Sequence, residues 1–152
     1  MKDDGWRLIV LVNGHGAVNH QRTLQRIARE ETAAPHVRVL DLMAWTPPPP
    51  PSEGPGHADR EETAVMLAVA EELVHLDALP PLETPLRYAD YGIVDTAAFD
   101  GFPAEGFLLP READPRVATR AEGEEIVRRE LEAARETVVR ELALLGLGPA
   151  PV

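Results

Sequence analysis

The sequence predicts an α/β fold with a mainly parallel sheet in a three-layer α/β/α arrangement, and three observations support this. A continuous apolar run at residues 6–12 is typical of a parallel-sheet strand that is buried on both faces. A stretch with helical periodicity follows at 19–32, and a second strand-like run follows at 36–42. Strand, helix and strand in this order form a right-handed crossover unit, which makes the two strands parallel neighbours in one sheet.

The rest of the chain alternates between helical patterns and irregular segments. Apolar residues at helical spacing predict two further helices, at residues 57–76 and 119–145. Between them we expect a proline-broken connection, a short strand and an ordered loop rich in Gly, Pro and Phe, at residues 78–85, 91–94 and 99–110. The length of 152 residues corresponds to one ordinary domain, so a single domain over residues 1–152 is expected.

Charge and composition exclude several classes of function. The formal net charge is -11 with a pI of about 4.8, which argues against nucleic acid and anionic membrane surfaces as partners. There is no cysteine, so neither a disulfide framework nor a cysteine-based zinc site is possible. The apolar run near the start is too short for a targeting or membrane-spanning segment. Together these features favour a cytoplasmic protein.

The strongest local signal is Asn13-Gly14-His15-Gly16, directly after the first predicted strand. Ligands in open α/β sheets bind beyond the carboxyl ends of the strands, and a histidine there can present a neutral nitrogen to a metal or substrate. The flanking glycines permit a tight turn and close approach of a ligand. The alternative is a strand-to-helix turn in which His15 only packs. Asn19 is the expected cap of the following helix.

A second signal is the segment from His57 to Thr63, which places a histidine before carboxylates at a helix start. Glu62 can coordinate a metal, and His57 can act on the substrate or in proton transfer. The alternative is stronger here, because acidic residues are favoured in the first turn of a helix by its dipole alone.

A third segment, from Asp114 to Thr119, leads into the last predicted helix. Asp114 and the following proline form a turn, Thr119 can cap the helix, and Arg116 can lock the turn to the rest of the fold. This pattern is read as structural. The remaining histidines lack clustered partners and are expected to be structural or exposed to solvent, at His20, His36 and His75. Asp95 and Asp100 lie in predicted loops and are weak candidates.

In this order and spacing, the three segments resemble the creatininase family of metal-dependent amidohydrolases. That family shows an Asn-Gly-His-Gly turn, then His-Ala-Gly-x-x-Glu-Thr, then Asp-Pro-Arg-x-Ala-Thr. Here the counterparts are residues 13–16, 57–63 and 114–119. The resemblance covers most of the chain. Each motif is weak by itself, and the ordered set is fairly specific.

The resemblance implies hydrolysis of a non-peptide C–N bond in an amide, cyclic amide or formamide, with one or two divalent ions (Zn, Mn or Fe) that polarise the carbonyl and activate water. By motif match, His15 and Glu62 are metal ligands, and His57 lies close to a small-molecule substrate. The resemblance further implies substrate-side backbone at Gly14 and Gly16, and structural roles for Asn13, Asp114 and Arg116.

The chain departs from the family pattern at several positions. Asp59 replaces the usual Gly, Ala64 stands where Ser is common, and Asn19 is displaced by one residue if it is the family's Asn. The family's other metal ligands, a Glu-x-His pair and an Asp, come from an N-terminal segment with no counterpart here. The expectation is therefore a C-terminal portion of such an enzyme, with the N-terminal strands missing.

Three hypotheses follow. In the first, the chain is an amidohydrolase completed by a complementary N-terminal chain, with homo-oligomers or aggregation when it is alone. In the second, it is a shortened non-catalytic relative that binds a metabolite or a partner subunit. In the third, it is a stand-alone enzyme in which His20 or Asp95 replaces the absent ligands.

Overall fold

A computed structural model describes residues 4–33, 36–44, 57–89, 92–94 and 107–148. The chain forms two compact units. The first consists of Met1–Pro48 with Arg129–Val152, and the second is Pro49–Arg128. Each unit is described below by itself, and the expectation of one domain over the whole chain stays a prediction.

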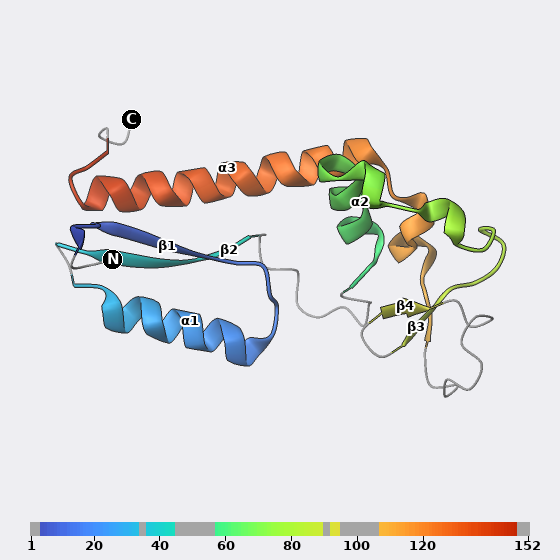
Figure 1. The fold of residues 1–152 in the computed structure, drawn as a ribbon, viewed down its shortest axis with the longest axis horizontal. Helices are drawn as coiled ribbons and strands as arrows, with labels where there is room; N and C mark the ends of the chain where they lie inside the picture. The colour runs from blue at the N-terminus through green and yellow to red at the C-terminus, as the bar shows by residue number, and fades with distance from the viewer. Residues whose placement is uncertain (1–3, 34–35, 45–56, 90–91, 95–106, 149–152) are drawn as a thin grey trace. The chain divides into compact units, whose positions relative to one another are not determined.

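The first unit is built on the predicted crossover. Strand β1 (Leu8–Asn13) pairs in parallel with β2 (Arg38–Met43), and helix α1 (Val18–Glu31) connects them (Figure 1). The register runs from Leu8 opposite Arg38 to Asn13 opposite Met43. The mixed α/β class and the parallel pairing are thus confirmed, with boundaries within two residues of those predicted.

Helices lie on both sides of this two-stranded sheet, with α1 on one side and the C-terminal part of α3 (Arg120–Leu144) on the other (Figure 1). Thr32 joins α1 to β2, because its hydroxyl donates to the Ala28 carbonyl and accepts from the Val39 amide. On the other side, Arg38 of β2 forms an ion pair with Glu141 of α3. Side-chain contacts therefore tie each helix to the sheet.

The sheet is less buried than the apolar sequence predicts. Residues 8–11 of β1 are only half-buried, and Val12 is 68% exposed. The physical reason is that β1 has one strand neighbour, β2, among the described residues, so it lacks the second neighbour of an interior strand. The prediction that this run is buried on both faces is wrong for the part of the chain described here.

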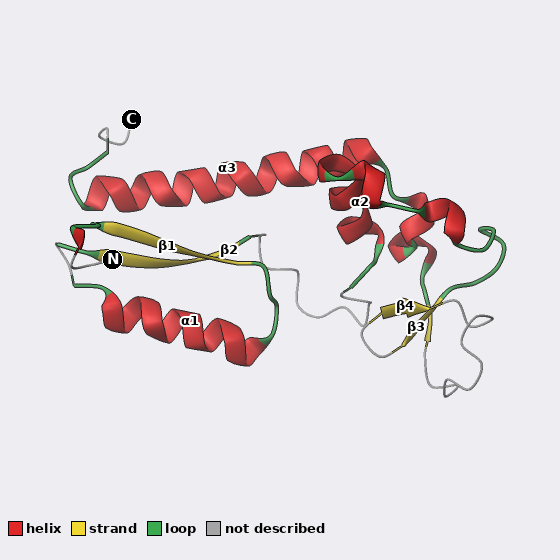
Figure 2. Cartoon of the chain, in the orientation of Figure 1, coloured by secondary structure: helices red, strands yellow, loops and turns green. Residues whose placement is uncertain are grey.

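The second unit contains α2 (Arg60–Val69) and the first part of α3. It also has short 3₁₀ turns at Glu71–Leu73, Leu76–Ala78, Arg111–Ala113 and Pro115–Val117 (Figure 2). The predicted helix over 57–76 is therefore wrong at both ends. It begins at Asp59, which caps it, and it ends where Ala70 adopts φ -156° and ψ 58°.

A small antiparallel sheet completes the second unit, with strand order β4-β3-β5. Its strands are β3 (Arg87–Ala89), β4 (Gly92–Val94) and β5 (Phe107–Leu108). The short strand expected at 91–94 is confirmed as β4. The expected loop at 99–110 contains β5, and its residues 99–106 lie outside the described part of the chain.

Gly123 allows α2 and α3 to pack closely within the second unit. A Cβ at Gly123 would lie 1.8 Å from the carbonyl oxygen of Ala64, which is itself fully buried. The absence of a side chain at Gly123 therefore lets α3 approach the backbone of α2 at Ala64. The start of α3 is capped as predicted, because the Glu122 amide donates to the Thr119 hydroxyl at 3.3 Å.

Among the described helices, none is long and apolar enough to cross a membrane. The polyproline segment at 47–51 and the candidates Asp95 and Asp100 lie outside the described residues.

Candidate functional site

The turn after β1 is organised by Asn13. This side chain is 3% exposed, its Oδ1 accepts from the His15 amide at 2.8 Å, and its Nδ2 donates to the His15 carbonyl at 3.2 Å. A buried amide that satisfies both backbone groups of one residue fixes that residue's position. Asn13 thus holds the backbone of His15 while leaving the His15 side chain exposed.

The two glycines of this turn face open space. A Cβ built at Gly14 or Gly16 would meet nothing within 4 Å, and neither residue has a positive φ. The fold itself therefore does not require glycine at either position. The approach of a ligand to the backbone at Gly14 and Gly16, which the family resemblance implies, stays a prediction.

His20 lies beside His15. The two ring centroids are 5.4 Å apart, and the ring planes meet at 67°, an edge-on arrangement. His20 belongs to the first turn of α1, where its amide donates to the Asn19 side chain at 2.9 Å. Asn19 is therefore not the helix cap: the cap position is Ala17, which makes no side-chain bond. The sequence pattern indicated no partner for His20. The ring of His20 contacts that of His15 because the turn between β1 and α1 brings these two residues together.

In the second unit, His57 and Glu62 lie together at the start of α2. The Glu62 Oε1 is 3.4 Å from His57 Nδ1, and its Oε2 accepts from the Ala58 amide at 2.6 Å. The Glu62 amide in turn donates to the Asp59 carboxylate at 3.0 Å. This reciprocal pattern is close to a capping box and stabilises the helix start. A carboxylate has about four lone-pair sites, so Glu62 keeps capacity for a further ligand.

The pKa of Asp59 is raised above its ordinary value. Partial burial is the main cause, and repulsion from the Glu62 carboxylate adds to it. Hydrogen bonds from the Glu62 and Glu61 amides act in the opposite direction without cancelling these effects. Asp59 therefore caps α2 and also places a second carboxyl beside Glu62.

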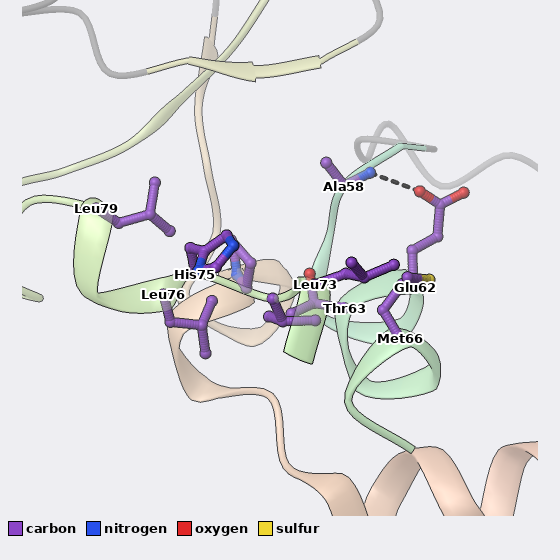
Figure 3. Close-up of a pocket in the computed structure, with 10 residues that line it drawn as sticks. Ala58, Glu62, Thr63, Met66, Leu73, His75, Leu76 and Leu79 are labelled. Atoms are coloured by element: carbon purple, nitrogen blue, oxygen red, sulfur yellow. Dashed lines mark hydrogen bonds between the residues drawn. The ribbon is translucent and has the colours of Figure 1, made fainter. Parts of the chain in front are cut away.

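An open cavity of about 420 Å³ lies next to Glu62. Figure 3 shows Ala58 and Glu62 on one side of it and His75 and Leu79 on the other. The remaining lining is mostly apolar and consists of Thr63, Met66, Leu73, Val74, Leu76 and Pro115. Among the described residues, the lining of this cavity includes no Lys or Arg. His75, which the sequence left without a role, lies in its wall.

Asp114 and Arg116 form a buried clamp. Their side chains are each 8% exposed and lie 2.6 Å apart between the Arg116 Nη2 and the Asp114 Oδ2. Arg116 Nη1 also donates to the carbonyls of Pro80, Pro81 and Thr84 at 2.7–3.1 Å. One guanidinium therefore ties the turn before α3 to the connection after α2, as the sequence predicted for Arg116.

Burial alone would raise the pKa of Asp114. Hydrogen bonds from the Arg116 side chain and amide, together with the positive charge of Arg116, lower it below its ordinary value instead. The same pair raises the pKa of Arg116. The carboxylate is thus held in its charged form inside the clamp.

Comparison of the sequence with known protein families gives a match, and it covers all three segments. The family model for creatininase, described as creatinine amidohydrolase, matches residues 1–138. The chain belongs to the creatininase family. No curated protein and no solved structure matches it. The family is one of amidohydrolases, and the match includes the segments around His15, Glu62 and Arg116.

The donor types that creatininase motifs place here suit a borderline divalent ion, since imidazole and carboxylate both bind Zn, Mn and Fe. The number of donors is the difficulty. Among the described residues, no group of three or more His, Asp or Glu side chains is placed to hold a metal. His15 belongs to the first unit and Glu62 to the second. Their proximity therefore stays a prediction.

Proposed function

We propose that this chain is a metal-dependent amidohydrolase that acts on a non-peptide C–N bond in an amide, cyclic amide or formamide. The observation that carries the proposal is membership of the creatininase family. The pairing of Glu62 with His57 beside a cavity supports it further. The ion, when bound, polarises the carbonyl and activates water.

His15 and Glu62 are the metal ligands in this proposal. The exposed ring of His15 stands on a backbone fixed by Asn13, and the Glu62 carboxylate is oriented by the Ala58 amide. The oriented Glu62 carboxylate loses little freedom when a ligand binds, which favours binding. Because a catalytic zinc site usually has three protein ligands, the proposal requires at least one more. A complementary chain, another copy or another residue of this chain can supply it.

In this proposal, His57 is the general acid or base. Its Nδ1 faces the Glu62 carboxylate, which leaves Nε2 free to meet the substrate, and its side chain is 55% exposed. A histidine with a carboxylate behind it is a suitable general acid or base, because the carboxylate orients the ring. The proposed role of His57 is therefore to protonate the leaving nitrogen or to take a proton from the water.

The cavity limits the substrate. Its lining among the described residues is mostly apolar, with the Glu62 carboxylate at one side. A charged or strongly polar group that finds no partner against an apolar wall is costly to bury. We therefore expect amides that carry a small apolar group.

The test is hydrolysis of a panel of cyclic amides, formamides and simple amides with added Zn²⁺, Mn²⁺ or Fe²⁺, by the purified chain alone and together with an N-terminal partner chain that carries a Glu-x-His pair. We expect little or no turnover by the chain alone and metal-dependent turnover with the partner. Metal-dependent turnover is expected to fall sharply in His15→Ala, Glu62→Gln and His57→Ala, and to be unchanged in His36→Ala, whose side chain is exposed. The second candidate is a non-catalytic metabolite-binding module, which the apolar cavity favours. Ligand binding that survives in Glu62→Gln, with no turnover under any metal, would select that module.

A further inference from the structure

The pair of rings at His15 and His20 offers a second metal ligand within the first unit. We propose that His15 and His20 together bind one divalent transition-metal ion, with His20 as a ligand that the family motifs do not assign. The proposal rests on the function above only for the identity of His15 as a ligand. Its geometric basis is the 5.4 Å separation of the two rings.

That separation fits coordination of a single ion. Histidine nitrogen binds zinc at about 2.0–2.1 Å, and two ligands of a tetrahedral ion subtend an angle near 109°. Each ring centroid then lies about 3.2 Å from the ion, which places the two centroids about 5.2 Å apart. The observed separation of the two centroids is 5.4 Å, which is close to this value.

Both side chains can change their ring orientation, and hydrogen bonds hold the backbone around them. The His15 and His20 residues are exposed, so packing does not oppose a change of ring orientation. Asn13 holds the His15 amide, Asn19 accepts from the His20 amide, and Gln21 donates to the Gly16 carbonyl at 2.7 Å. The turn and the first turn of α1 are thereby joined before any ion binds. The positive end of the α1 dipole opposes a cation here, an effect that is screened by salt and falls off within the first turn.

His20 would give the first unit two imidazole ligands for one ion. Two imidazoles are a common part of catalytic zinc sites, which usually have a third protein ligand as well. The alternative account of the ring pair is an edge-on aromatic contact without any metal.

The test separates coordination from ring packing. Zn²⁺ affinity is measured by calorimetry and Co²⁺ binding by its visible absorption, using the full chain and the variants His20→Ala, His20→Phe, His15→Ala, Glu62→Gln and His36→Ala. His20→Phe keeps an edge-on ring but has no nitrogen to donate. Circular dichroism confirms that each variant is folded.

We expect both His20 variants to lose about tenfold or more in affinity, because losing a ligand should cost at least as much as losing an outer partner. The Co²⁺ absorption should change in both, and His36→Ala should match the unaltered chain. Full affinity in His20→Ala, or affinity kept by His20→Phe alone, would overturn the inference. If the His20 variants bind normally while His15→Ala and Glu62→Gln do not, the proposed function stands without this ligand. If no variant loses affinity, both proposals fail.

Discussion

The amide of Ala58 donates to the Glu62 carboxylate at 2.6 Å, and Ala58 does so from a left-handed backbone with φ of 54°. Within the described part of the chain, Ala58 is the one non-glycine residue with a positive φ. Such a conformation costs an alanine about 1–2 kcal/mol, and strain of this kind is often found at functional sites. The orientation of Glu62 is thus maintained at the expense of local stability.

Replacement of Ala58 by Gly should remove this strain and keep the amide donor. The larger entropy of glycine in the unfolded chain offsets about 0.4–1 kcal/mol of the gain. We therefore expect Ala58→Gly to leave the free energy of unfolding unchanged or to raise it by up to about 1 kcal/mol. The matched control is Ala133→Gly, at an exposed position inside α3, which should lower it by about 1 kcal/mol. Urea unfolding measures both. An equal loss in the two variants would show that Ala58 is unstrained.

Gly123→Ala should destabilise the second unit. Helix propensity alone predicts a gain of about 1 kcal/mol for this change. The added methyl group would meet the backbone of Ala64 at 1.8 Å, so the helices must separate, which typically costs about 1–3 kcal/mol. The sign of the change in thermal or urea stability therefore decides between the two effects. Gly16→Ala is the control, because nothing lies within 4 Å of its added Cβ. Stabilisation by Gly123→Ala would contradict the packing of α2 against α3.

Asp114→Asn should lower the free energy of unfolding at neutral pH, and the loss should be smaller at acidic pH. The pKa of Asp114 is lowered in the folded chain, so its contribution is present above its unfolded value of about 3.9. That contribution disappears as the pH falls through the still lower folded pKa. The loss should be about 1–3 kcal/mol at pH 7, because the buried Arg116 keeps its charge without an anionic partner.

Urea midpoints of the two proteins at pH 7, 5, 4 and 3 measure this pH dependence. The difference between the unaltered chain and Asp114→Asn should be constant from pH 7 to 5 and shrink below pH 4. A difference that grows in acid would mean that Asp114 is not held in its charged form.

The sequence predicts the regular part of the fold well. Residues 6–12 and 36–42 pair in parallel as β1 and β2, and the helix between them is α1, because the hydrophobic pattern there is long enough to show its period. Helix α3 is predicted almost to the residue. The pattern fails after Val69, where apolar residues continue at helical spacing but the backbone breaks at Ala70. Leu73 continues the apolar pattern, but its side chain is 64% exposed. Apolar residues at helical spacing therefore did not indicate a helix where they are not buried.

The site is only partly accessible from sequence. The pairing of His57 with Glu62 follows from their spacing at a helix start, and the clamp between Asp114 and Arg116 follows from the turn. The strain at Ala58 and the ring contact between His15 and His20 do not, since both depend on backbone angles in irregular segments. Strands of two or three residues, such as β3 and β5, are too short to show a period.

The central proposal, which rests on the creatininase motifs, is that His15 and Glu62 bind the same ion. The most direct measurement is Zn²⁺ stoichiometry after dialysis against a weak chelator, for the full chain, His15→Ala, Glu62→Gln and the double variant. The account predicts that each single variant loses the same tightly bound ion and that the double variant loses no more. If one single variant keeps a tightly bound ion that the other lacks, the two residues serve separate sites and the claim is wrong.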